Sequence, residues 1–180
     1  SNGGAVDLYY GGAKKLETTS TGIDVTGITV SDGMSTNTSG TSNFRAGVNA
    51  GNSITGGGNF NTVVGDEAGT AITTGDNNVA IGYASLDALN TASNNTAIGH
   101  NALTLDTKGS NSVAIGKGTL ANQNFTSATD SYNVAVGSSA GNDITTGTLN
   151  TLIGGLAGDA ITTGAANVAV GYRSLSATTT

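Results

Sequence analysis

The stretch Asn-Val-Ala-Ile-Gly at residues 78–82 decides the fold, because the chain repeats it. The same order, a polar residue, three mostly apolar residues and a glycine, occurs eight times in all. The closing glycines are Gly47, Gly65, Gly82, Gly99, Gly116, Gly137, Gly154 and Gly171, at steps of 18, 17, 17, 17, 21, 17 and 17 residues. A near-constant period of this length is typical of a solenoid or another repeat array.

The composition argues against an ordinary globular domain. The 180 residues include 29 Gly, no Pro and no Cys, and only 10% are charged. Leu, Ile, Val and Phe together make up about 20% of the chain, which is close to the limit below which a compact core is hard to build. Stacked repeats, with an interior shared among several chains, are another way to bury enough apolar surface.

The composition also excludes several functions. The net charge of −6 provides no basic surface for nucleic acid, and no run of apolar residues is long enough to span a membrane, so neither partner is expected. With one His and no Cys, the parts of a zinc site or a Ser-His-Asp triad are missing. We therefore predict no catalytic residue, no metal site and no cofactor, and a protein that is not an enzyme.

Three segments are expected along the chain. Residues 1–30 contain short alternating runs around the turn signal Gly11-Gly12, which predict an N-terminal β segment with strands at 6–10, 13–19 and 23–30. Residues 31–42 are polar and aperiodic, as in a linker. Residues 43–180 carry the repeats.

A unit of 17 residues without a 3.6-residue apolar pattern has room for two short strands and two turns. The predicted fold is therefore all-β, a parallel β-solenoid or β-roll of about eight coils. The coils are of two types, which differ at the fourth position after the repeat glycine. One type has Gly at this position and Ile three residues later, and the other type has Leu at this position. We interpret this as compensation for buried volume.

The polar residue that opens each repeat has two interpretations. Stacked coils would align these side chains into an amide ladder, in which each amide bonds to the next. The candidate members are Asn61, Asn78, Asn95, Asn133, Asn150 and Asn167, with Ser112 as a gap. Alternatively, these residues only form the turns between coils.

From Gly65 onward, the last apolar residue before each repeat glycine is β-branched, and the residue before that is mostly Ala. Such neighbours suit a strand that is packed on both faces. One coil with one or two large apolar side chains encloses little core alone, so we expect a homotrimer that shares an interior. The predicted shared core is Val64, Ile81, Ile98, Ile115, Val136, Ile153 and Val170.

Two phrases carry a family resemblance. Asn-Asn-Val-Ala-Ile-Gly-Tyr-Ala-Ser-Leu at 77–86 and Asn-Asn-Thr-Ala-Ile-Gly-His-Asn-Ala-Leu at 94–103 resemble the head repeats of trimeric autotransporter adhesins, and more closely the related repeats of bacteriophage tail fibres. The resemblance covers about 43–180 and implies a trimeric parallel β-roll. The stretch at 6–27 resembles a segment of phage tail fibres, which favours the phage over the bacterial adhesin.

The resemblance implies a structural and adhesive protein in the virion, outside the cell. Its expected partners are its own copies, other virion proteins and a host surface glycan or receptor. A bacterial trimeric adhesin or an extracellular filament subunit is the alternative. An ice-binding solenoid is a third hypothesis, because Thr73-Thr74, Thr145-Thr146 and Thr162-Thr163 could form a threonine array.

Candidate receptor contacts lie where the repeat varies. The residue after each glycine changes from coil to coil, which indicates an outward-facing side chain, and the 21-residue repeat adds four residues within 121–132. The candidates are Tyr83, His100, Lys117, Phe125, Tyr132, Tyr172 and Arg173. Phe125 either contacts sugars or folds back over the solenoid. The acidic pair Asp66-Glu67 is either a solvated turn or a weak calcium site.

Overall fold

The computed structural model describes residues 6–19, 22–25 and 40–177. Within these residues the chain is all-β and contains no helix. The chain divides into two compact units, 1–34 and 35–180. Part of the predicted third strand (26–30) and most of the predicted linker (31–39) lie outside the described residues.

The first unit is a three-stranded antiparallel sheet in the order β1-β2-β3. Its strands are β1 (Asp7–Tyr10), β2 (Ala13–Thr19) and β3 (Gly22–Val25). Gly11 and Gly12, with φ of 61° and 75°, form the turn between β1 and β2, because a left-handed turn of this kind favours glycine. Lys14 Nζ lies 3.0 Å from Asp7 Oδ2 across the hairpin and 3.0 Å from Glu17 Oε2 on its own strand.

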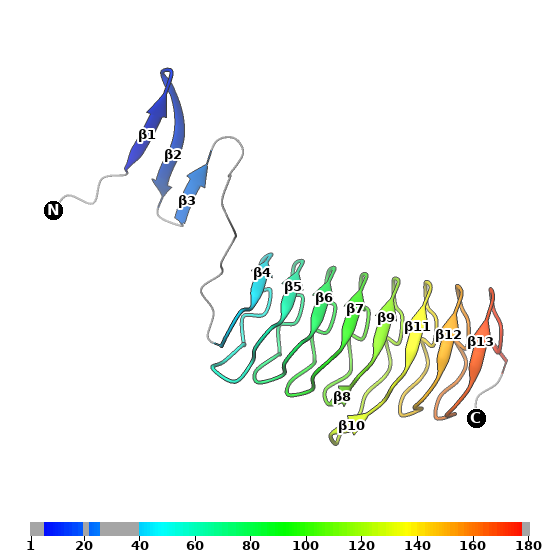
Figure 1. The fold of residues 1–180 in the computed structure, drawn as a ribbon. Coiled ribbons are helices and arrows are strands. Elements are labelled where there is room, and N and C mark those ends of the chain that lie inside the picture. The colour runs from blue at the N-terminus through cyan, green and yellow to red at the C-terminus, as the bar shows by residue number, and fades with distance from the viewer. Residues whose placement is uncertain (1–5, 20–21, 26–39, 178–180) are drawn as a thin grey trace. The chain divides into compact units, whose positions relative to one another are not determined.

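The second unit is a parallel β-solenoid (Figure 1). Eight strands enclose seven complete coils, so the eighth expected coil is incomplete. The strands pair in register from one end to the other. They are β4 (Phe44–Ala46), β5 (Thr62–Val64), β6 (Val79–Ile81), β7 (Thr96–Ile98), β9 (Val113–Ile115), β11 (Val134–Val136), β12 (Thr151–Ile153) and β13 (Val168–Val170).

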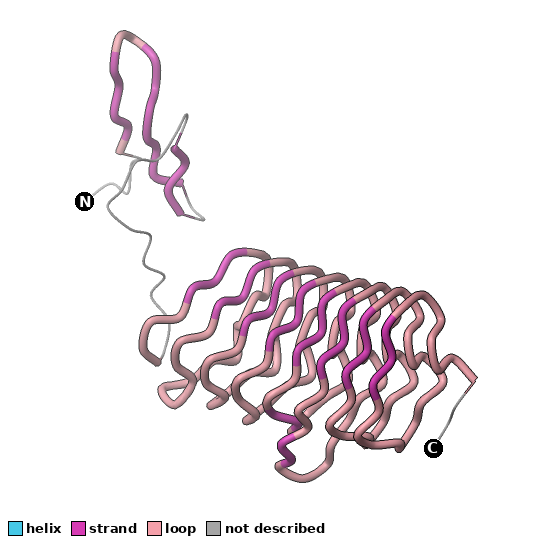
Figure 2. The backbone as a smooth tube through the Cα atoms, turned by 45° about the vertical axis from the view of Figure 1, so that its right-hand side comes forward, coloured by secondary structure: helices cyan, strands magenta, loops and turns pink. Residues whose placement is uncertain are grey.

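Each coil has one regular strand of three residues, not the two strands that the sequence predicted. The rest of the coil consists of turns joined to the next coil by isolated backbone hydrogen bonds, such as Gly69 N–H to Ser85 O at 2.8 Å. Figure 2 shows this difference as one row of magenta strands above pink loops. In the described residues a second pairing occurs only between β8 (Gly109–Ser110) and β10 (Thr129–Asp130).

A close stack of glycines ends the strands. Gly99 has φ of 132°, and a Cβ placed on it would lie 2.6 Å from the carbonyl carbon and oxygen of Gly116 in the next coil. Gly65, Gly82 and Gly137 have the same close approach to the glycine that follows. Because real Cβ atoms do not come this near to a backbone, the coils stack at this spacing only with glycine.

Side chains of the single chain fill the interior of the solenoid. In the seven solenoid strands that follow β4, the middle residue points inward and is buried, as in Ala80, Ala97 and Ala114. In β4 this residue is the half-buried Arg45. Opposite these alanines lies a row of fully buried Leu and Ile side chains. It comprises Ile72, Leu86, Leu89, Leu103, Leu120, Ile144 and Ile161. This row corrects the expectation that one coil encloses little core by itself.

Two interior positions of the same coil compensate each other in side-chain volume. Leu86, Leu103 and Leu120 follow strands whose inward residue is Ala, whereas Gly158 follows the strand whose inward residue is Leu152. A Cβ placed on Gly158 would lie 2.7 Å from Leu152 Cδ2 and 3.0 Å from Ile161 Cδ1. The Gly–Ile pairing noted in the sequence therefore reflects a filled space, because the larger side chains occupy the room that glycine leaves.

Candidate functional site

The asparagines that open the repeats are buried and linked from coil to coil. In one unit of this ladder, Asn78 donates from Nδ2 to Asn61 Oδ1 at 3.1 Å and to Ala92 O at 3.0 Å. Asn78 Oδ1 in turn accepts the backbone N–H of Asn95 at 3.0 Å. Each side chain thus supplies donors and an acceptor to backbone groups that no strand partner satisfies.

The same pattern extends along most of the solenoid. Direct amide-to-amide bonds join Asn61 to Asn43, Asn78 to Asn61, Asn150 to Asn133 and Asn167 to Asn150. Ser112 interrupts the row, although its backbone N–H still donates to Asn95 Oδ1 at 2.9 Å. These bonds tie successive coils together on the inner side, so the asparagines do more than shape turns.

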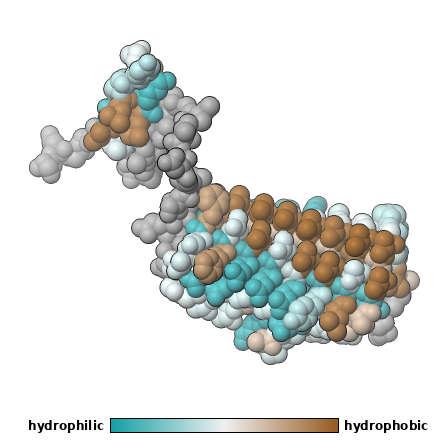
Figure 3. All heavy atoms as spheres, viewed as in Figure 1, coloured by the Kyte–Doolittle hydropathy of each residue, from teal (hydrophilic) through white to brown (hydrophobic). Residues whose placement is uncertain are grey.

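The seven residues predicted as a shared core point away from the interior of the single chain. They alternate with the inward alanines, so they lie on the outer face of the eight-stranded sheet. Their side chains range from half-buried to exposed, and Ile153 is 42% exposed. Figure 3 shows this face as rows of brown apolar side chains that run along the stack of coils.

A second row widens this outer apolar face. The first residue of each strand also points outward, with Val79, Val113, Val134 and Val168 among its members and Thr in the other coils after the first. Val168 is 70% exposed. We call these two rows, at the first and third positions of β4, β5, β6, β7, β9, β11, β12 and β13, the outer apolar face.

Tyr83, His100 and Lys117 occupy the same position in three successive coils, and all three are exposed. The Tyr83 and His100 rings stack, with centroids 5.4 Å apart and planes inclined by 20°. This contact covers one face of each ring. The negative charge of Glu67, followed by partial desolvation, raises the pKa of the Tyr83 hydroxyl above its ordinary value.

Of the remaining predicted receptor contacts, three are exposed and one is buried. Tyr172 and Arg173 are exposed in the last coil, and Tyr132 is exposed beside the four-residue insertion. Phe125 is only 5% exposed, so the prediction that it contacts a receptor is wrong. The alternative that it folds back over the solenoid is correct, since its apolar ring gains more from burial than from solvent contact.

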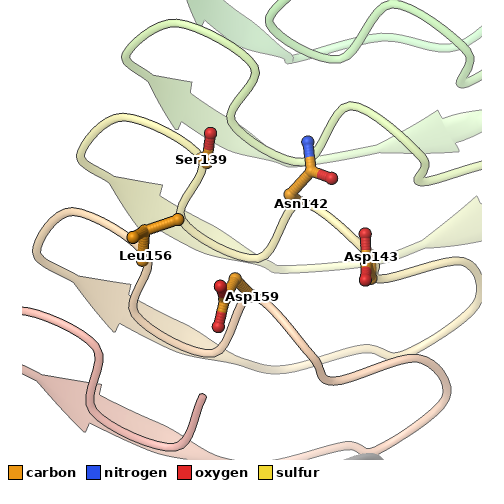
Figure 4. Close-up of a pocket in the computed structure, with 5 residues that line it drawn as sticks. All are labelled: Ser139, Asn142, Asp143, Leu156 and Asp159. Carbon is orange, nitrogen blue, oxygen red and sulfur yellow. The ribbon is translucent and has the colours of Figure 1, made fainter.

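The sequence did not indicate a polar pocket between two neighbouring coils near the C-terminal end (Figure 4). Its volume is about 300 Å³, and its lining consists of Ser139, Asn142, Asp143, Leu156 and Asp159. Asp159 Oδ1 is buried without a hydrogen-bond partner. The equivalent residue Asp87 accepts a bond of 2.7 Å from Thr104 in the next coil. Asp159 Oδ1 therefore lacks the partner that the carboxyl group has at this position in the coil of Asp87.

The described residues contain no group of three or more His, Asp or Glu side chains arranged to bind a metal ion. Asp66 and Glu67, the acidic pair considered as a weak calcium site, are both exposed. In the described part of the chain no helix is long and apolar enough to cross a membrane. Searches of protein families, curated proteins and solved structures find no match to this chain.

Proposed function

We propose that this chain is a structural and adhesive segment of a phage tail fibre, in which three copies associate along their solenoids. The assembly attaches the virion to a glycan or another receptor on the host surface, and other virion proteins continue the fibre. It performs no catalysis. The observation that carries the proposal is the outer apolar face, which runs along the whole sheet and which no part of the described chain covers.

Lateral association of identical chains suits this face physically. Its Val and Ile side chains repeat at the spacing of the coils, so a second copy presents the same spacing and can align row against row. Burying apolar area contributes roughly 25 cal/mol per Å², and contacts along eight strands add up over a long interface. The number of copies, three, comes from the family resemblance.

The adhesive role rests on the other exposed positions. Tyr83, His100 and Lys117 lie after the turn glycines, outside the outer apolar face, so they stay accessible when that face is covered. Their hydroxyl, imidazole and ammonium groups offer hydrogen bonds of the kind that a polar surface glycan needs.

A bacterial trimeric adhesin would use the same geometry, and the tail-fibre resemblance of residues 6–27 favours the phage. The hydrogen bonds weigh against the ice-binding hypothesis. Thr73 and Thr145, which would belong to a threonine array, donate their hydroxyls to Asn90 and to Thr162 O in the next coil. These hydroxyls therefore serve the stacking of the coils.

The mass of the protein in solution tests the proposal. We expect the wild-type chain of 17.5 kDa to elute with three times that mass in light scattering. The double variant Ile98→Lys/Ile115→Lys places two charges on the outer apolar face and should give a folded monomer. Ser138→Lys, at an exposed position outside that face, is the matched control and should stay trimeric.

A stable wild-type monomer at high protein concentration would contradict the assembly. The adhesive role is tested separately, by binding of fluorescent trimer to host cells before and after enzymatic removal of surface glycans. Trimeric protein that binds no cell surface would leave a structural segment without the adhesive role.

A further inference from the structure

Three irregularities of the repeat coincide in neighbouring coils. Seven residues after the repeat glycine, the other complete coils have Ile or Leu, whereas Asp106 and Gln123 occupy this position in two successive coils. Ser112 replaces Asn in the ladder between them. The coil that contains Gln123 also carries the four-residue insertion. Asp106, Ser112 and Gln123 are all fully buried.

Asp106 receives donors from two coils. Its Oδ1 accepts the backbone N–H groups of Gly109 at 2.9 Å, Lys108 at 3.2 Å and Phe125 at 3.3 Å. Its Oδ2 accepts Gln123 Nε2 at 2.6 Å. A buried carboxyl group is tolerated only with such partners. Here they come from residues 108–109 of its own coil and from residues 123–125, where the insertion begins in the next coil.

Gln123 reconnects the interrupted ladder. Its Nε2 also donates to Ser112 Oγ at 3.0 Å, and its Oε1 accepts Asn133 Nδ2 at 2.8 Å. Ser112 Oγ is hydrogen-bonded to Ser131 Oγ, and Ser131 Oγ bonds to Ser110 O at 3.0 Å. We call Asp106, Ser112, Gln123, Ser131 and Asn133 the polar junction.

Apolar packing around the polar junction supports the same segment. Leu103 and Leu120, in the same two coils as Asp106 and Gln123, are fully buried. Phe125 is buried over Gly109, where a Cβ would lie 2.7 Å from Phe125 Cδ2 and would also collide with Asp106. Glycine at this position thus admits both side chains.

The segment between Phe125 and Ser131 protrudes from the row of turns. It lies at β10 in Figure 1, and in Figure 2 it is the pink loop beside the lowest short magenta strands. Thr126, Ser127 and Ala128 at its tip are exposed. Its returning arm is joined to the preceding coil by the β8–β10 pair and by a bond of 2.8 Å from Asn111 Nδ2 to Asp130 Oδ1.

We infer that the polar junction holds the insertion loop, residues 124–130, in one conformation, so that the loop is a preformed protrusion of the solenoid. Asp106 and Gln123 are positioning residues for this loop. A loop that is already ordered binds a partner without the entropic cost of ordering it. The inference concerns the single chain and does not depend on the proposed fibre.

Hydrogen–deuterium exchange tests the inference. In the wild-type protein the amides of Gly109, Phe125 and Ser131 should exchange as slowly as those of β6 and β12. In Asp106→Leu/Gln123→Leu, which places in both coils a residue that the row already contains at Leu89, we expect exchange at 106–132 to accelerate at least tenfold, with β6 and β12 unchanged. Asp87→Asn, at a half-buried carboxyl with one acceptor bond from Thr104, should change neither region.

Equal acceleration in all coils would overturn the inference, because the junction would then stabilise the solenoid as a whole. Unchanged exchange at 106–132 would overturn it as well. A second variant keeps both leucines and lacks residues 126–129, which restores a 17-residue repeat. We expect it to melt above the double variant that retains the loop, and an equal or lower melting temperature would also contradict the role assigned to the junction.

Discussion

The inner and outer faces of the same eight-stranded sheet use opposite kinds of residue. On the inner face the strand residue is usually Ala and is fully buried, as at Ala80 and Ala114. On the outer face the adjacent residue is Val or Ile and remains partly exposed, as at Ile81. A soluble single chain would be expected to show the reverse distribution of size.

The reason for this difference lies in the space available on each side. Inside, the strands face a row of Leu and Ile side chains across a narrow coil, so a large inward residue fits only where Gly replaces the opposing Leu, as with Leu152 and Gly158. Outside, no described part of the chain limits side-chain size. The inner face is therefore fitted within one chain, whereas the outer face is open in the described chain, and it is there that we propose contact between chains.

The largest expected effect is on the glycine stack. Gly99→Ala would bring a Cβ to 2.6 Å from the Gly116 carbonyl at a φ of 132°, and we expect it to lower the free energy of unfolding by on the order of 4 kcal/mol. Gly155→Ala is the matched control, because its φ is ordinary and its nearest neighbour would lie 3.6 Å away. Urea unfolding measures both, and equal stabilities would refute the close stacking.

The second effect concerns the inner ladder. Asn78→Ala leaves Asn95 N–H and Ala92 O without their partners in a buried setting, and should cost on the order of 3 kcal/mol. The exposed Asn122, whose amide bonds are long at 3.4 Å, is the control, and Asn122→Ala should change stability by less than about 0.5 kcal/mol. If the two alanine variants melted together, the ladder would not stabilise the coils.

The third prediction tests the exchange of volume inside the coil. Ala80→Leu overfills the interior and should destabilise by about 1–3 kcal/mol. Adding Leu86→Gly reproduces the arrangement of Leu152 and Gly158 and should recover much of the loss. Thermal unfolding of the single and double variants measures the coupling, and additive losses would contradict it.

The fourth prediction concerns the outer face of the strand that contains Ala80. Val79→Leu enlarges an outward residue of the same strand and should change the stability of a monomer by less than about 0.5 kcal/mol. A much larger and concentration-dependent loss would show that another chain covers this face.

The smallest effect is electrostatic. The charge of Glu67 raises the pKa of Tyr83, because it disfavours the phenolate. Glu67→Gln removes this charge, so the pKa of Tyr83 should fall toward its ordinary value. Ultraviolet absorbance of the phenolate during an alkaline titration measures the change, with Glu17→Gln in the separate N-terminal sheet as a control that should leave the titration of Tyr83 unchanged.

Much of the solenoid could be predicted because its determinants are periodic. The repeat glycines, the asparagines and the alternation of Ala with Val or Ile all follow one spacing, and each requirement is local to two neighbouring coils. The polar junction was missed although a signal was present. Asp106 and Gln123 stand seven residues after Gly99 and Gly116, where the other complete coils have Ile or Leu, and this pairing of two polar substitutions was visible in the sequence.

The sequence by itself determined the parallel stacking of coils and the direction in which the strand residues alternate, since a fixed period and a two-residue alternation leave few other arrangements. Only the tertiary structure decided which side of the strand is the interior. The alternation is symmetric, so Ala and Ile were equally possible inward residues until the opposing Leu row limited the space. The same packing placed Phe125 inside and left Asp159 Oδ1 unpaired, because both depend on which side chains of neighbouring coils lie opposite each other.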